Sequence, residues 1–248
     1  MGRCDRQGEQ MKVSITIPVY NEAEIIKKII SEIDAKVVKK GNFEFIVVED
    51  GSNDGTKEVL KKIGKKYNLL LFMDNERRGY HGALKYALTI PKGDVIFFSD
   101  SDGQHDPANF WDLYKYVDDY DIISGFRIIR TDPFHRIILS RIYNFSLLPL
   151  FSTFFRDSNC GFKIIKKRVI DDVLGDVKYI KFGFSTEFLV LAKKRGYKIL
   201  EVPVTHRKRT TGRATQFEIR RLPKAIVAQI LGMISLKRFL VSSRKYRG

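Results

Sequence analysis

The chain has 248 residues, enough to bury the core of one large domain, and its 44% hydrophobic and 30% charged residues are ordinary for a globular protein. Its 45 Lys and Arg against 29 Asp and Glu give a formal net charge of +16, which indicates an anionic partner: nucleic acid, a phosphorylated substrate or an acidic membrane surface. A generally Lys-rich surface is the alternative explanation of this charge.

Cysteines and apolar runs indicate where the protein works. Cys4 and Cys160 lie far apart, which argues against a disulfide framework or a metal–thiolate site and favours a reducing, intracellular setting. The first ten residues are polar and lack the apolar core of a signal peptide. No run is expected to reach the roughly 18 apolar residues of a membrane-spanning helix, since the longest candidate, 225–236, is shorter.

Strand and helix patterns alternate along the first hundred residues. Short runs rich in β-branched and aromatic residues predict buried strands at 13–19, 43–48, 69–73 and 95–98. Apolar residues at helical spacing between these runs predict amphipathic helices, the first of them at 22–37. This alternation predicts a Rossmann-like α/β fold with a mostly parallel central sheet. A Gly-rich dinucleotide fingerprint and a P-loop are both missing, so nicotinamide redox chemistry and ATP hydrolysis lose support.

The second half continues the alternation with longer polar and basic stretches. We expect a helix at 107–117, a strand at 122–125, extended chain at 157–165, a helix at 185–195 and a final strand at 199–204.

Two stretches of this half combine positive charge with apolar residues. Residues 127–150 suit contact with an amphiphile that has an anionic head, or else form a helix that packs on the sheet with solvated arginines. Residues 217–241 predict an amphipathic helix with a basic face, either a membrane-interfacial helix or one that packs on the core or dimerises. The predicted organisation is a flexible tail at 1–10, an α/β domain at 11–215 and a basic amphipathic helix at 216–248.

An acidic cluster follows the strand predicted at 95–98. Asp100 and Asp102 alternate with small residues, so their carboxylates and the Gln104 amide oxygen can converge on one point. Ligands bind beyond the carboxyl ends of the strands in open α/β sheets. Hard oxygen donors suit Mg²⁺ or Mn²⁺. A turn that binds nothing is the alternative, because Asp, Ser and Gly are common turn residues.

Three motifs in order carry a family resemblance. Residues 18–22 (Pro-Val-Tyr-Asn-Glu), 48–56 (Val-Glu-Asp-Gly-Ser-Asn-Asp-Gly-Thr) and 100–107 (Asp-Ser-Asp-Gly-Gln-His-Asp-Pro) each follow or end a predicted strand. They resemble the signatures of family 2 GT-A glycosyltransferases, and within these the dolichol-phosphate mannose synthase branch of polyprenyl-phosphate glycosyltransferases. The resemblance runs from about Met11 to Thr215.

The resemblance implies a set of site residues. Donor-binding residues would be Pro18, Tyr20, Glu22, Glu49, Asp50, Arg78, Asp100 and Arg209. The metal ligands would be Asp100, Asp102 and Gln104, and the acceptor phosphate would contact Arg127, Arg136 and Ser140. Asp102, Arg127 and Arg136 would be catalytic. Two positions depart from the family: Glu49 stands where Asp is more common, and 213–215 reads Arg-Ala-Thr where Ser and Lys commonly occur.

The implied reaction is an inverting, metal-dependent sugar transfer from GDP-mannose to a polyprenyl phosphate at the cytoplasmic face of a membrane. UDP-glucose is the alternative donor, and a glycolipid hydroxyl is an alternative acceptor. A hydroxyl acceptor would require a general base, for which Asp102, Asp106 and Glu187 are candidates. The competing classes are a nucleic-acid-binding module, which the spread of the basic residues disfavours, and a nucleotide-sugar-binding protein without catalysis.

Overall fold

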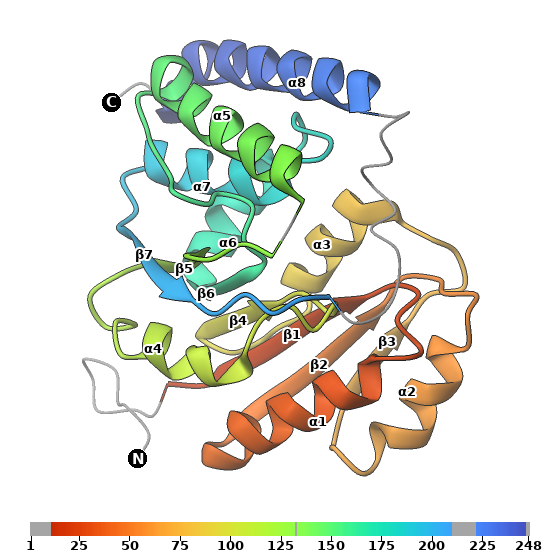
Figure 1. Cartoon of the computed structure of the whole chain (residues 1–248). Helices are drawn as coiled ribbons and strands as arrows, with labels where there is room; N and C mark the ends of the chain where they lie inside the picture. Colours follow the sequence, from red (N-terminus) through yellow and green to blue (C-terminus); the bar gives the residue numbers. More distant parts are fainter. Residues whose placement is uncertain (1–10, 132, 210–221, 247–248) are drawn as a thin grey trace.

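The structure is a computed structural model that describes residues 11–131, 133–209 and 222–246 (Figure 1). Its strands form one seven-stranded sheet in the order β3-β2-β1-β4-β6-β5-β7. The strands are β1 (Val13–Val19), β2 (Phe43–Glu49), β3 (Leu70–Met73), β4 (Val95–Ser99), β5 (Ile122–Arg127), β6 (Phe162–Lys166) and β7 (Ile199–Val204). This arrangement confirms the predicted α/β fold with a mostly parallel sheet.

Helices cover both faces of the sheet, and each face buries one large core cluster. One face carries α1 (Ile26–Lys36), α2 (Thr56–Gly64) and α4 (Phe110–Tyr114), as Figure 1 shows. The other carries α3 (Gly79–Thr89), α5 (Phe134–Phe151), α6 (Lys167–Val173), α7 (Phe184–Lys194) and α8 (Leu222–Ser242). Strand residues alternate between the two clusters, as the period of two in a strand requires: Phe97 belongs to the first and Ile96 to the second. Because β1 pairs in parallel with both β2 and β4, the carboxyl ends of these three strands meet at one edge of the sheet.

Strand β6 interrupts the parallel order. It pairs antiparallel with β4, where Phe162 lies opposite Ser99, and antiparallel with β5, while β5 and β7 pair in parallel. The extended chain expected at 157–165 is wrong in its first part, because the strand begins only at Phe162. Before it, the chain turns with a hydrogen bond from the Cys160 N–H to the Asp157 carbonyl oxygen.

Two predicted helices are shorter than expected. The helix predicted at 22–37 begins at Ile26, after a turn in which the Glu22 carbonyl oxygen accepts the Ile25 and Ile26 N–H groups. The helix predicted at 107–117 divides into a 3-10 turn at Pro107–Asn109 and the single turn of α4. The turn before α1 follows β1, and the 3-10 turn before α4 follows the loop after β4.

Helix α8 differs from the predicted basic helix. Met233, Leu236 and Leu240 pack into the second core cluster, whereas the middle of the outer side is apolar. The described cations Lys224, Lys237 and Arg238 stand near its two ends instead of along one face.

The expectation about spanning length is also wrong. By length and composition alone, the segment Pro223–Ser242 is long and apolar enough to cross a membrane, and 28% of its most apolar window is buried within the protein. The predicted tail at 1–10 and the departure at 213–215 lie outside the described residues.

Candidate active site

The acidic loop begins directly after β4. The Asp100 N–H donates to the Gly161 carbonyl oxygen at 2.9 Å, and Asp102 Oδ1 accepts the Gln104 N–H at 3.1 Å. Gly103 between them has a φ of +70°, which favours glycine, so the chain reverses tightly enough to keep both carboxylates at the strand end. Burial, followed by the charge of Asp102, raises the pKa of Asp100 to about 7. Two carboxylates that compete in this way favour a cation between them.

Gly161 leaves the space that Asp100 occupies. A Cβ atom at position 161 would lie 1.8 Å from Asp100 Oδ2, so any other residue displaces the carboxylate. This contact exists because β6 runs antiparallel beside β4 and brings residue 161 back to the end of β4. Spacing along the sequence alone does not reveal this contact.

Tyr20 and Asp50 meet through an arginine that the sequence analysis missed. The Arg77 guanidinium lies 3.8 Å from the centroid of the Tyr20 ring, and its Nε lies 3.9 Å from Asp50 Oδ2. Burial raises the pKa of Asp50, although the Arg78 N–H donates to Oδ1 at 2.7 Å. The ends of β1 and β2 therefore present an aromatic ring and a carboxylate side by side, next to Pro18 in β1.

Two predicted donor residues have other partners in the structure. Glu49 is fully buried, accepts the Ser52 N–H and lies 3.7 Å from Lys57 Nζ, so it holds the loop after β2. The Arg78 guanidinium turns to Asp74, with Nε 2.5 Å from Oδ2, and stacks on Tyr86. Only the backbone N–H of Arg78 reaches the site.

Arg209 connects β1 to the acidic loop. Its Nη2 donates to Glu22 Oε1 at 2.9 Å, and its Nη1 lies 4.0 Å from Asp102 Oδ2. Burial raises the pKa of Glu22 to about 7, although the Arg209 charge opposes this shift. The structure thus brings together Glu22, Asp102 and Arg209, which are 187 residues apart at the extremes.

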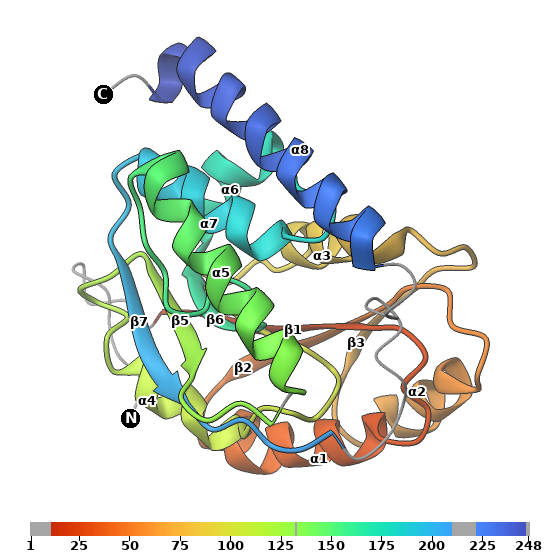
Figure 2. The same ribbon diagram turned by 45° about the horizontal axis from the view of Figure 1, so that its top comes forward.

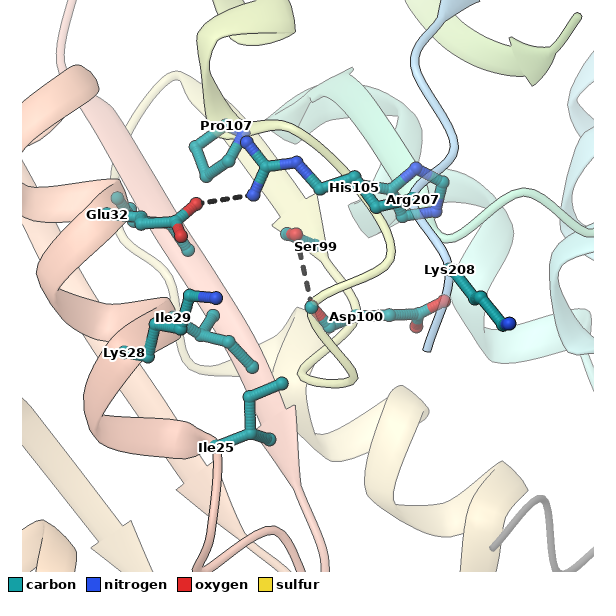
Figure 3. A pocket seen from close by; sticks show the side chains of 12 residues that line it. Ile25, Lys28, Ile29, Glu32, Ser99, Asp100, His105, Pro107, Arg207 and Lys208 are labelled. Carbon is teal, nitrogen blue, oxygen red and sulfur yellow. Dashed lines mark hydrogen bonds and ion pairs between the residues drawn. The ribbon is translucent and has the colours of Figure 1, made fainter. Parts of the chain in front are cut away.

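Arg207 holds the segment that carries Arg209. Its N–H donates to the Gln104 carbonyl oxygen at 2.6 Å, and its guanidinium pairs with Glu32 at 2.6 Å and Asp106 at 2.7 Å. Glu32, Asp100 and Arg207 line a pocket of about 120 Å³ between α1 and the acidic loop, and Figure 3 shows Arg207 directed toward Glu32. Arg207 therefore ties β7, α1 and the loop together on one side of the two carboxylates.

Two of the predicted acceptor residues, Arg127 and Ser140, have direct partners in the structure. Arg127 donates to Asp157 through Nε at 2.6 Å and Nη2 at 2.8 Å, and its side chain is only 13% exposed. Ser140 accepts from Arg130 Nη1 at 2.6 Å, and Arg136 lies half-buried in the first turn of α5. Arg130 and Asp157 are thus the direct partners of two predicted residues, and no spacing rule in the sequence pairs them.

Two of the candidate general bases are tied up in the fold. The buried Glu187 carboxylate accepts the N–H groups of Lys178, Tyr179 and Ile180 at 2.7–2.8 Å. Burial raises the pKa of Asp106, but hydrogen bonds from Lys36, the Ala108 N–H and Arg207 outweigh this effect and hold the pKa at about 2. Asp102 is the remaining candidate, and it lies at the acidic loop itself.

The sheet order and the carboxylates after β4 place the fold in the GT-A class of glycosyltransferases. Glucosyl-3-phosphoglycerate synthase from Mycobacterium tuberculosis, solved with Mn²⁺, uridine diphosphate and phosphoglyceric acid, superposes with a TM-score of 0.68 and 18% identity. The match covers 92% of this chain and 78% of that one. Residues 14–174 match Glycosyl transferase family 2, and the chain belongs to this family of glycosyltransferases.

The chain is also similar in sequence to two relatives. An uncharacterized protein of Methanocaldococcus jannaschii is 32% identical over 204 residues, which covers 78% of this chain and 80% of the relative. A dolichol-phosphate mannosyltransferase of Pyrococcus furiosus is 29% identical over 211 residues, which covers 82% of this chain. This chain spans 58% of the length of the Pyrococcus enzyme.

Proposed function

We propose that the protein transfers a sugar, with inversion, from a nucleotide sugar to a polyprenyl phosphate at the cytoplasmic face of a membrane. The observation that carries the proposal is the pair Asp100 and Asp102 at the end of β4 with Arg209 opposite them. GDP-mannose is the first choice of donor because of the likeness to the Pyrococcus mannosyltransferase. UDP-glucose is the second, since a neighbour in fold was solved with this donor and Mn²⁺.

The acidic loop fits a divalent cation. Asp100 and Asp102 supply oxygen donors, and Gln104 adds its amide oxygen while its Nε2 donates to the Arg207 carbonyl oxygen at 3.4 Å. Among the described residues, no group of three or more His, Cys, Asp or Glu side chains is placed to hold a metal ion. Donor phosphates and water would therefore complete the shell of Mg²⁺ or Mn²⁺. When bound, the cation neutralises charge on the departing nucleoside diphosphate.

Side chains of this protein bind the rest of the donor. Tyr20 offers a flat ring on which a base can stack, and Asp50 accepts hydrogen bonds from the base or the ribose. Arg209, paired with Glu22 and close to Asp102, exchanges these carboxylates for the diphosphate when the donor binds. The pKa of Glu22 near 7 supports this exchange, since a proton can replace the arginine there.

A phosphate acceptor explains why a strong base is not required. The second pKa of a phosphate monoester is near 6, so the acceptor is already largely dianionic at neutral pH. Arginines then orient it through paired N–H groups. Asp157 fixes the plane of the Arg127 guanidinium, while Arg136 and Ser140 lie along the start of α5.

A two-phase assay tests the proposal. Purified protein is incubated with labelled GDP-mannose or UDP-glucose, a polyprenyl phosphate, and Mn²⁺ or EDTA. We expect label in the organic phase with Mn²⁺ and background counts with EDTA, and the productive donor identifies the sugar. Metal-dependent donor binding without transfer would contradict the lipid phosphate as acceptor. Transfer in excess EDTA would contradict the cation.

A further inference from the structure

Helices α5 and α8 expose an unusual amount of apolar surface. On α5 the exposed large side chains are Phe134, Ile138, Ile142, Phe145 and Leu148, whose spacing of three or four residues places them on one side of the helix. On α8 the exposed large side chains are Ile226, Val227, Ile230, Leu231, Ile234 and Val241. Large apolar side chains gathered on the surface in this way mark an interaction site.

The two helices present this surface together. They lie side by side at the same end of the molecule in both views (Figures 1 and 2), and the Ser146 hydroxyl lies 3.9 Å from Met233 Sδ. Their inner residues, among them Leu147 and Leu236, join the same core cluster, so their apolar outer sides both face away from the sheet. We call the exposed residues of both helices the α5–α8 face.

The charges of the α5–α8 face have one sign. Neither helix contains Asp or Glu, while Lys224 lies in the first turn of α8, Lys237 and Arg238 stand nearer its end, and Arg141 is exposed on α5. A second copy that paired through this face would bring cations together without a counter-charge. An anionic lipid surface neutralises them and accepts the apolar side chains at the same time.

We propose that the α5–α8 face docks on an anionic lipid bilayer, with α8 lying in the plane of the interface. Met233, Leu236 and Leu240 hold α8 on the domain, so crossing the bilayer would require these core contacts to break. Cations at both ends of the apolar middle can reach the headgroups from this position. Length alone would equally allow a spanning helix, and the packing decides against it.

The position of α5 relates this face to the site. The same helix carries Arg136 and Ser140 near its start and the apolar stripe along its length, and exposed Ile128 and Ile129 precede it. A lipid whose chain lies in the bilayer therefore presents its phosphate at the acceptor arginines. This last step rests on the proposed function, whereas docking on lipid does not.

Vesicle flotation tests the docking. Wild-type protein and the variants Ile230→Glu/Leu231→Glu and Leu70→Glu are floated with vesicles of phosphatidylglycerol or of phosphatidylcholine. Leu70 is a matched control, because it is 46% exposed and lies in β3 on the far edge of the sheet. We expect wild type and Leu70→Glu to float with phosphatidylglycerol, with the bound fraction of the double variant lower by about tenfold or more. Weaker flotation with phosphatidylcholine is expected for all three proteins.

Three results would overturn the docking: no flotation of wild type, equal flotation of the double variant, or a stable dimer in solution that the double substitution dissociates. Sugar transfer separates this question from the proposed function. The double variant is expected to keep transfer to a short, water-soluble prenyl phosphate and to lose transfer to a long-chain acceptor in vesicles. A wild type that floats but is inactive with both acceptors would contradict the proposed reaction and leave the docking intact.

Discussion

The two halves of the sheet end in different kinds of surface. Around β1, β2 and β4, the strand ends carry carboxylates that pair with arginines and backbone N–H groups. In the described residues up to 127, only Leu70 and Tyr80 are large apolar side chains exposed to solvent. The half built on β5, β6 and β7 has its own buried ion pair, yet it leaves the α5–α8 face uncovered. The first half thus presents charged and polar groups to water, which suits a charged small molecule, whereas the second exposes apolar side chains, which suit an apolar partner.

The largest effect is expected from the carboxylates of the first half. Asp102→Asn removes one charge from the acidic loop without changing its volume, so transfer should fall by about a thousandfold. The two-phase assay measures this loss, and circular dichroism is expected to show an unchanged fold. Asp112→Asn, an exposed carboxylate on α4, is the matched control and should keep full activity. Activity near wild type in Asp102→Asn would refute the assignment of the loop.

The second half is expected to depend on its ion pair for stability. Asp157→Asn removes the carboxylate charge that pairs with the buried Arg127 guanidinium, which costs about 3–5 kcal/mol in the free energy of unfolding. The exposed pair of Arg78 and Asp74 has the same chemistry, and Asp74→Asn should cost about 0.5 kcal/mol. Urea denaturation of both variants compares the pairs directly, and equal losses would refute the difference.

The pH dependence of the same pair has a defined sign. Burial opposes the charge of Asp157, but the hydrogen bonds and charge of Arg127 lower its pKa below the usual 3.8. The stabilisation by the pair is therefore fully present above pH 3.8 and is lost as the pH falls through the lowered pKa. The difference between wild type and Asp157→Asn should shrink over this range.

A smaller effect is expected where the halves touch. Gly161→Ala pushes a methyl group against the Asp100 carboxylate, so binding of Mn²⁺ with a nucleoside diphosphate should weaken by about 10- to 100-fold. Gly175→Ala meets nothing within 4 Å and serves as the control. Isothermal titration calorimetry measures both, and unchanged binding in Gly161→Ala would show that the two halves do not cooperate in holding the acidic loop.

The smallest effect is expected on the α5–α8 face itself. Phe145→Ser removes a side chain that is 66% exposed, so the free energy of unfolding should change by less than about 0.5 kcal/mol. Leu147→Ala, two residues along the same helix, creates a cavity in the core and should cost about 2–5 kcal/mol. Thermal denaturation distinguishes the two, and a large loss in Phe145→Ser would mean that this face contributes to folding.

The sequence was sufficient for the strands, their alternation with helices and the place of the acidic loop, because each rests on local patterns of apolar and turn residues. It was not sufficient for the partners of the charged groups. Arg127 meets Asp157, and Asp100 meets Gly161, only because β6 runs antiparallel beside β4, which no local pattern encodes. The exposed apolar side chains in the middle of α8 could not be predicted for a similar reason, since packing against the core decides which side of the helix is exposed.

The antiparallel strand also has a consequence for the order in which the molecule can assemble. Strands β1 to β4 are consecutive in the chain and adjacent in space, whereas the outer edge of β4 stays open until residues 162–166 arrive, and β5 gains β7 only from residues 199–204. Contacts between such distant segments form slowly. During synthesis on the ribosome, the nascent chain therefore carries an unpaired, wholly apolar edge at Val95–Phe98, the kind of edge that recruits other chains. Chaperone demand and aggregation of truncated products should rise for chains that end before β6.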